Sequence, residues 1–93
     1  MIYAYAHINI TNPASIAAYR EKAGAALSKH GGALVTATPE ATNLEGPLAV
    51  PSLAVLLSFP DKAAALAWIN DPELASVHEL RRGAGESSVI LLG

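Results

Sequence analysis

The fold of this chain is decided by the stretch Ser52–Gly83, SLAVLLSFPDKAAALAWINDPELASVHELRRG, which predicts a buried strand followed by two helices. Ser52–Phe59 is almost continuously aliphatic, as is typical of a strand covered on both faces in the middle of a sheet. Pro60 cannot donate to a strand ladder, whereas Asp61 can accept from the first amides of a helix. We therefore expect a helix over Lys62–Ile69 directly after the strand.

A second helix is expected after Asn70, which breaks the first one. Asp71-Pro72 supplies a capping side chain and then a proline at the first helical position, where its missing N–H is no loss. The helix should run to Arg82, since cations in the last turn suit the negative end of the helix dipole. Gly83 is expected to close it in the left-handed conformation.

The N-terminal segment Ile2–Ile10 alternates strictly and therefore predicts a strand with two different faces. Small aliphatic side chains occupy one face, which suits packing under helices. The other face carries phenol, imidazole and amide groups, which need water, a partner or a polar cavity: Tyr3, Tyr5, His7 and Asn9.

The middle of the chain predicts one helix and one further strand. Asn12-Pro13 repeats the pattern of a cap followed by proline, and the helix should run to about His30. Ala33–Thr38 is a β-prone segment, and Thr42–Leu44 can extend the same strand. A loop over Gly46–Pro51 then leads back to the buried strand.

The C-terminal segment Ser87–Leu92, SSVILL, predicts a closing strand after a flexible connection at Gly83–Gly85. The order strand, helix, strand, strand, helix pair, strand is the split βαβ repeat of the ferredoxin-like α+β fold. Four antiparallel strands should lie under helices on one face, and two right-handed crossovers should place the first and third strands in the centre. We expect a single domain over residues 1–93.

Composition predicts a cytoplasmic homodimer. Hydrophobic residues make up 52% of the chain and charged residues only 15%, so apolar surface should remain uncovered in a monomer. The bare sheet face would carry Tyr3, Tyr5 and either Val55 or Leu56, and burying ~800 Å² per partner against a second copy is ample driving force. No apolar run approaches the ~18 residues that a membrane span needs, so no membrane association is expected.

Several classes of chemistry are excluded by what the chain lacks. It has no cysteine, which rules out disulfides and thiolate sites. Its net charge is −2 and it has no basic cluster beyond Arg81-Arg82, so nucleic acid is not an expected partner. The carboxylates form no evident acid–base pair, and no phosphate-binding loop occurs. The sequence therefore predicts no metal site and no resident cofactor.

Short motifs in a fixed order give the chain a family resemblance. They are H-G-G at His30–Gly32, L-E-G at Leu44–Gly46, F-P-D at Phe59–Asp61, A-W at Ala67-Trp68 and D-P-E at Asp71–Glu73, with Arg81 and the closing Gly93. Through these motifs the chain resembles the domain-of-unknown-function 1330 family over nearly its whole length. The resemblance implies a dimeric α/β-barrel, in which two ferredoxin-like sheets face each other, and it implies no particular reaction.

The chain departs from this family pattern at several positions. Ser58 stands where members commonly have an acidic residue, and Ser52 and Ala37 stand where they commonly have arginine. Leu74 replaces an aromatic residue. These departures imply a pocket with a less polar lining and a less polar ligand than a charged family pocket would bind.

A second, local resemblance involves W-x-N at Trp68–Asn70 and H-x-x-R at His78–Arg81. These motifs are similar to those of haem-degrading and antibiotic-biosynthesis monooxygenases of the same barrel superfamily. The resemblance implies a catalytic set of Asn9, Trp68 and His78, with His78 as the axial haem ligand.

Each candidate residue also has a purely structural interpretation. For His78 we favour a half-exposed helix histidine because no second partner is evident, and for Trp68 we favour a core position. Arg81 can either enter the space between sheet and helices and hold a carboxylate, or cap the end of its helix. Tyr5 and His7 can line a cavity or, as we favour, lie in an interface across a two-fold axis.

Three hypotheses about function follow, and the sequence leaves open whether the protein is an enzyme. The first is binding of a small organic molecule, with any reaction unassigned, in a pocket between sheet and helices. The second is a cofactor-free or haem-degrading monooxygenase, and the third is a non-catalytic dimerisation module. Under the first hypothesis the pocket is lined by Tyr5, His7, Tyr19, Trp68, His78 and Arg81.

Overall fold

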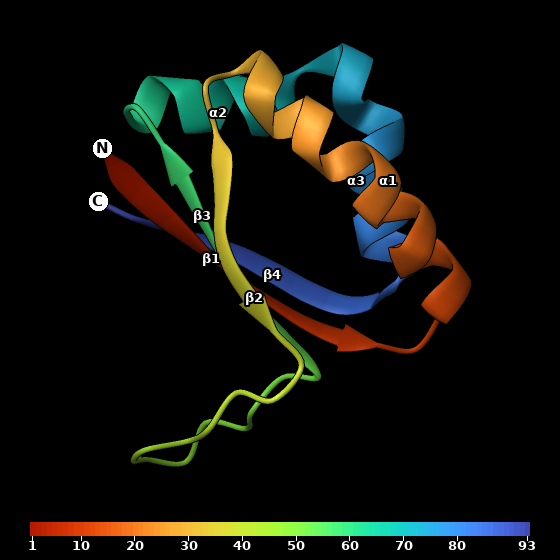
Figure 1. Ribbon diagram of the computed structural model, residues 1–93, viewed down its shortest axis with the longest axis vertical. Helices are drawn as coiled ribbons and strands as arrows, with labels where there is room; N and C mark the ends of the chain where they lie inside the picture. Colours follow the sequence, from red (N-terminus) through yellow and green to blue (C-terminus); the bar gives the residue numbers. More distant parts are fainter.

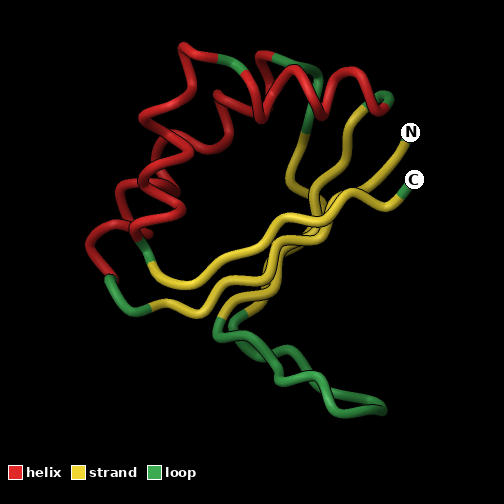
Figure 2. The backbone as a smooth tube through the Cα atoms, turned by 180° about the vertical axis from the view of Figure 1, so that it is seen from behind, coloured by secondary structure: helices red, strands yellow, loops and turns green.

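The computed structural model describes residues 1–93, and its strands and helices follow the predicted order. The elements are β1 (Ile2–Ile10), α1 (Pro13–Lys29), β2 (Ala33–Thr38), β3 (Leu53–Phe59), α2 (Lys62–Asn70), the 3-10 turn η1 (Pro72–Leu74), α3 (Ala75–Gly83) and β4 (Gly85–Leu92). The strands pair antiparallel in the order β2-β3-β1-β4, and the helices lie together over one face of this sheet (Figure 1, Figure 2). The predicted α+β fold, with the first and third strands in the centre, is confirmed.

The register of the central strand β1 directs its small residues toward the helices. Ala4 pairs with Leu57 of β3 and with Leu91 of β4, so these three side chains share the inner face of the sheet. Ala6 and Ile8 continue this face, and both are buried. Because alanine fills little volume, the centre of the sheet leaves room beneath the helix layer.

The helix starts are fixed by side-chain caps, as the sequence predicts. Asn12, Asp61 and Asp71 each accept from a backbone N–H two or three residues further on, at 3.3, 2.8 and 2.9 Å respectively. Pro13 and Pro72 occupy the first positions after two of these caps, where proline loses no hydrogen bond.

The helix pair differs from prediction at its middle. Asn70 is the last residue of α2 and does not break it early. The second helix is divided, because Asp71 and Pro72 close the short 3-10 turn η1 before α3 begins at Ala75. The buried side of α3 carries Val77, His78 and Arg81.

The connection from α3 to β4 also differs, because its middle residue, Ala84, is buried and hydrogen-bonded to another part of the chain. Gly83 is the last residue of α3, and the glycine with positive φ is Gly85, at 150°. Ala84 is fully buried, and its carbonyl accepts from the N–H groups of Thr11 and Asn12 at 2.8 and 3.0 Å. These bonds tie the end of α3 to the turn between β1 and α1.

The predicted extension of β2 over Thr42–Leu44 is wrong. Residues 39–52 form a loop that projects beyond the end of the sheet (Figure 1, Figure 2). The side-chain amide of Asn43 donates to the carbonyls of Gly46 and Leu48 at 3.1 and 2.7 Å, and this local turn competes with strand pairing.

The outer face of the sheet is uncovered within one chain. Tyr3, Ile90 and Leu92 lie on it and are 40%, 54% and 53% exposed. Tyr5 pairs with Leu56, which places Leu56 on this face, and Val55 points to the inner side with its partner on β1. Strand β3 is therefore not covered on both faces by its own chain.

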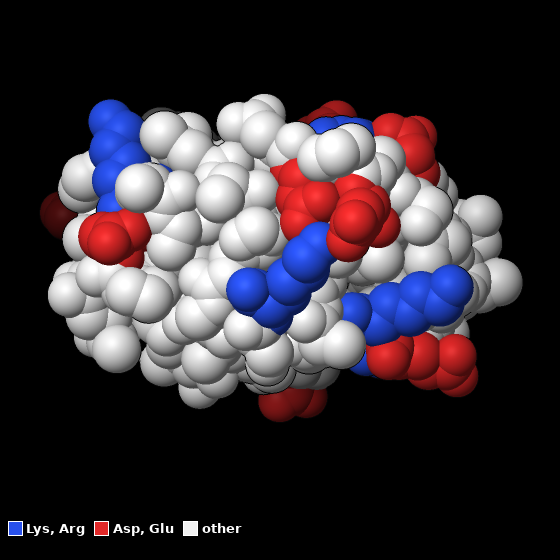
Figure 3. Space-filling model, turned by 90° about the horizontal axis from the view of Figure 1, so that it is seen from above, with Lys and Arg blue, Asp and Glu red and all other residues white.

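The surface of the helix layer carries charges of both signs side by side, separated by broad uncharged areas (Figure 3). It does not form an extended patch of a single sign. None of the helices combines the length and the apolar composition that crossing a bilayer requires.

Two glycine-to-alanine substitutions should have opposite effects on stability. Gly85 has a positive φ, and an added Cβ would collide with the backbone of Asn9, so Gly85→Ala should lower the free energy of unfolding by more than about 2 kcal/mol. Gly24 lies within α1 with no atom near an added Cβ, so Gly24→Ala should raise it by about 0.5–1 kcal/mol. Urea unfolding of both variants measures these changes, and equal effects would contradict the described β4 start.

Candidate functional site

The larger of the two main cavities lies between α1 and the inner face of the sheet and has a volume of ≈ 580 Å³. We call it the α1 cavity. One face of α1 roofs it, and there Ile16, Tyr19, Ala23 and Leu27 recur at helical spacing. The lining is mostly hydrophobic, and its only charged side chains are arginines.

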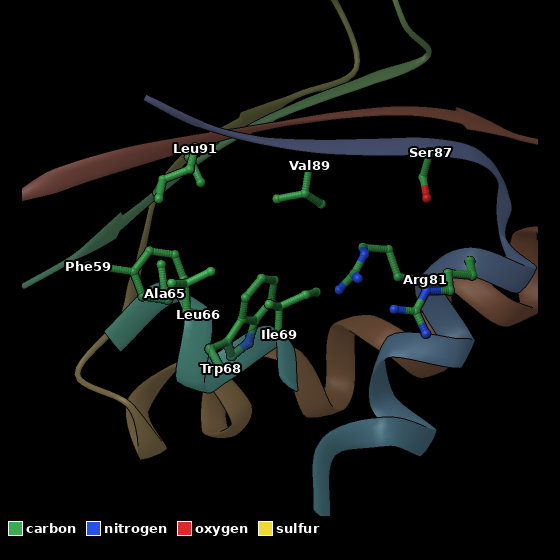
Figure 4. Close-up of a pocket in the computed structure, with 11 residues that line it drawn as sticks. Phe59, Ala65, Leu66, Trp68, Ile69, Arg81, Ser87, Val89 and Leu91 are labelled. Atoms are coloured by element: carbon green, nitrogen blue, oxygen red, sulfur yellow. The ribbon is translucent and has the colours of Figure 1, made fainter. Parts of the chain in front are cut away.

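The smaller cavity lies between α2, α3 and strand β4 and has a volume of ≈ 340 Å³ (Figure 4). We call it the α2 cavity. Trp68 and Ile69 of α2 lie across it from Val89 and Leu91 of β4, and Arg81 reaches it from α3.

The two cavities share three lining residues, Trp68, Arg81 and Val89. We call this group the shared wall. Its three members come from α2, α3 and β4, so the wall exists only when both helices are docked on the sheet. His78 and Tyr19 both contact this wall through Arg81.

Arg81 is a buried cation without an anionic partner. Its side chain is 4% exposed, and none of the ion pairs of the chain involves it. Its Nη1–H group donates to Nδ1 of His78 at 2.8 Å and lies 3.4 Å from the hydroxyl of Tyr19. Its Cζ atom lies 5.3 Å from the ring centroid of Trp68 and 5.6 Å from that of Tyr19, within cation–π range. Of the two predicted positions, Arg81 therefore takes the one between sheet and helices.

His78 is 1% exposed, so the favoured interpretation as a half-exposed helix residue is wrong. Its Nε2 lies 2.9 Å from the carbonyl oxygen of Trp68, which can only accept, so Nε2 carries the proton. Nδ1 is then the acceptor for Arg81. Burial, followed by the nearby guanidinium of Arg81, lowers the pKa of His78 and keeps the ring neutral. The sequence missed this pairing because the carbonyl that completes it belongs to another helix.

Trp68 lies in the core, as predicted, and is 3% exposed. Its ring packs against Phe59 with centroids 5.4 Å apart and meets His78 edge-on at 4.7 Å. Its indole Nε1–H is buried and has no hydrogen-bond partner in the protein. A buried donor without an acceptor is rare in native proteins, so the indole N–H is a candidate group for contact with a ligand.

Three predicted site residues lie on the outer face of the sheet, away from the cavities. Tyr5 and His7 are on that face with ring centroids 6.1 Å apart, so they do not line the pocket between sheet and helices. Asn9 is on the same face, and its side-chain oxygen accepts from the N–H of Ser52 at 3.3 Å. The strict alternation of β1 explains the error, because it sends these side chains away from α1.

The residues expected to serve a haem group do not fit it. Asn9 is separated from Trp68 and His78 by the sheet. Both ring nitrogens of His78 are engaged, one with a backbone carbonyl and one with Arg81, so neither is free as an axial ligand. Nowhere in the chain do three or more histidine or acidic side chains gather as metal ligands.

A charged cluster that sequence reasoning missed joins the end of α1 to η1. Lys29 and His30 both contact Oδ2 of Asp71, at 2.7 and 2.8 Å, and Lys29 also contacts Glu73 at 2.6 Å. Hydrogen bonds from Lys29 and His30 lower the pKa of the Asp71 carboxyl well below its ordinary value. The H-G-G and D-P-E motifs contain His30, Asp71 and Glu73, but helix caps and a family resemblance alone do not indicate that these residues meet in space.

A family model for the domain of unknown function DUF1330 matches the chain over residues 1–93. The chain belongs to this family. A crystal structure of the RPA0582 protein of unknown function from Rhodopseudomonas palustris is similar to this DUF1330 chain, with a TM-score of 0.76, 22% identity and coverage of 98% of this chain and 79% of that one. A crystal structure of methylated RPA0582 protein is also similar, with a TM-score of 0.73 and 21% identity, and the match covers 98% of this chain and 78% of that one. At these identities the likeness shows the fold alone, and no curated protein matches the chain.

Acidification should destabilise this DUF1330 protein through His78. Its folded-state pKa is below the ordinary value, so below about pH 6.5 the unfolded chain binds more protons than the folded chain. The free energy of unfolding should therefore fall as the pH drops from about 7.5 to about 5.5. Urea unfolding followed by the fluorescence of Trp68, the only tryptophan, measures this slope.

A pair of histidine variants assigns the slope to its residue. His78→Gln removes the titrating ring from the core, so its unfolding free energy should depend less on pH in this range. His7→Gln, on the outer face of the sheet, is the matched control and should keep the wild-type slope. The same slope in all three proteins would show that His78 does not cause it.

Proposed function

We propose that this DUF1330 protein binds a small organic molecule in the α1 cavity. The observation that carries the proposal is the cavity itself, because concave, mostly apolar clefts are where small molecules commonly bind. Its volume of ≈ 580 Å³ falls in the range of ligand pockets, and its walls are mostly apolar with a small number of polar groups. An apolar ligand body with one polar end fits such walls best.

The mouth of the α1 cavity is at the edge strand β2. Leu34 lines the cavity and is 58% exposed, and the neighbouring lining residues Ala37 and Pro39 are also at the surface or close to it. On the opposite side Gly24 of α1 leaves open space where other residues carry a side chain. A ligand can therefore enter between α1 and β2 without unfolding either element.

The residues of the α1 cavity favour binding over acid–base catalysis. No histidine and no carboxylate lines it, and its polar side chains are Tyr19, Arg20 and Arg81 together with the indole N–H of Trp68. A general base near neutral pH requires a group that can accept a proton there, and none of these groups does so readily. The residues of the monooxygenase hypothesis, Asn9, Trp68 and His78, do not come together within one chain.

Filling the cavity should weaken the binding of a neutral apolar probe. N-phenyl-1-naphthylamine, which becomes fluorescent in apolar surroundings, should bind the wild-type protein, and Ala23→Leu should weaken it at least about tenfold by occupying the roof of the cavity. Ala25→Leu makes the same change on the exposed side of α1 and should leave binding unchanged. Equal binding to both variants would contradict the proposed site.

A second proposal concerns the outer face of the sheet, which we propose is covered by a second copy of the chain. Tyr3, Ile90 and Leu92 expose large apolar surfaces on one continuous face, with Tyr5 and Leu56 between them. Two such faces have the same register and shape, which suits an isologous contact of ~800 Å² per partner. Tyr5 and His7 would then lie in the interface, which agrees with the favoured interpretation of their sequence pattern.

A charge in the middle of this face should separate the two copies. Ile90→Glu should shift the wild-type dimer to a monomer in sedimentation velocity at micromolar concentration, because a carboxylate would be buried without a partner. Ala25→Glu, on the exposed side of α1, is the control and should remain dimeric. A monomeric wild-type protein would end this proposal and leave the α1 cavity unaffected.

A further inference from the structure

The shared wall presents hydrogen-bond donors without acceptors. Of the donors on the Arg81 guanidinium, only Nη1 has partners in the protein, and the buried Nε has none. The Nε1–H group of Trp68 is buried and unpaired as well. The Cζ atom of the guanidinium lies 5.3 Å from the centroid of the Trp68 ring, so the two residues with unpaired donors are neighbours in the shared wall.

From these donors we infer that the ligand of the α1 cavity is a carboxylic acid with an apolar body, whose carboxylate binds Arg81 and Trp68. The inference rests on the proposed function and names the class of molecule that the site takes. An arginine is always protonated, and a buried charge is costly unless an opposite charge or acceptors compensate it. No carboxylate side chain lines either cavity, so an opposite charge for Arg81 would come from a bound anion.

The neighbours of Arg81 hold the guanidinium in place and do not neutralise it. The neutral ring of His78 accepts from Nη1, and the donation of its own Nε2–H to the Trp68 carbonyl fixes the ring. Tyr19 lies on the other side, with its hydroxyl 3.4 Å from Nη1. The guanidinium donors other than Nη1 therefore have no partner in the protein, and a guanidinium suits bidentate binding of a planar carboxylate.

The remainder of the cavity determines the rest of the molecule. From the shared wall to the β2 edge the lining is apolar, with Ile16, Leu27, Leu53 and Leu57 among its residues. A space of ≈ 580 Å³ is far larger than a carboxylate alone. An aliphatic or arylaliphatic chain that extends from the carboxylate toward β2 would fill it, which excludes a small inorganic anion as the best ligand.

The test compares an acid with its neutral amide. Octanoate and octanamide have the same length, and 3-phenylpropanoate and 3-phenylpropanamide form a second pair. At least one acid should bind the wild-type protein about tenfold or more tightly than its amide in calorimetric titration, since charge-assisted hydrogen bonds are about twice as strong as neutral ones. The indole N–H signal of Trp68, the only tryptophan, should move in a ¹H–¹⁵N spectrum when that acid is added.

Variants of two adjacent arginines separate the site from general charge. Arg81→Gln should lose the preference for the acid, whereas Arg82→Gln, which removes an exposed arginine paired with Glu79, should keep it. Arg81→Lys keeps the positive charge but loses the paired N–H donors of the guanidinium, so it should retain only part of the preference for the acid. If the Arg81 variants do not fold, the comparison of acid and amide with the wild-type protein and its indole signal decides the matter alone.

The possible outcomes distinguish this inference from the proposed function. Amides that bind as tightly as the acids would overturn the carboxylate assignment and leave the binding function in place. Binding of N-phenyl-1-naphthylamine without binding of either acid would overturn it in the same way. Failure of that probe as well as of both acids would overturn the proposed function together with the inference.

Discussion

The arrangement beneath the helices depends on one hydrogen-bonded chain, which runs from the backbone carbonyl of Trp68 through His78 to Arg81. The carbonyl fixes the proton on one ring nitrogen, and the other nitrogen then holds the guanidinium over the indole ring. The chain links α2 to α3 and keeps a cation between two cavities. Without it a flexible arginine would reach for water, as this residue type usually does.

This chain of bonds gives the neutral histidine a clear physical role. A protonated His78 would place a second positive charge beside Arg81 in a region of low dielectric constant, so burial and repulsion act in the same direction on its pKa. The ring therefore acts as an acceptor that orients Arg81. Its engaged nitrogens also explain why the geometry offers no axial ligand, although the motif spacing resembles that of haem-degrading enzymes.

The one-sided helix layer explains both proposed binding surfaces. Alanines in the central strand leave space between sheet and helices, and the strict alternation of β1 places its phenols and imidazole on the other side. The inner face thus carries the cavity that we propose binds a small molecule, and the outer face carries the apolar surface that we propose meets a second copy. Because the two surfaces lie on opposite sides of the sheet, each can be altered without touching the other.

Local patterns in the sequence were sufficient for the fold and for part of the site. Alternation in Ile2–Ile10 and the caps before each helix determined the strands and helix starts, because these signals act within a few residues. The position of Arg81 was left open, since a helix end allows its long side chain to turn either way. Only the tertiary structure decided that it turns inward, where residues distant in the sequence supply the carbonyl, the ring and the empty space around it.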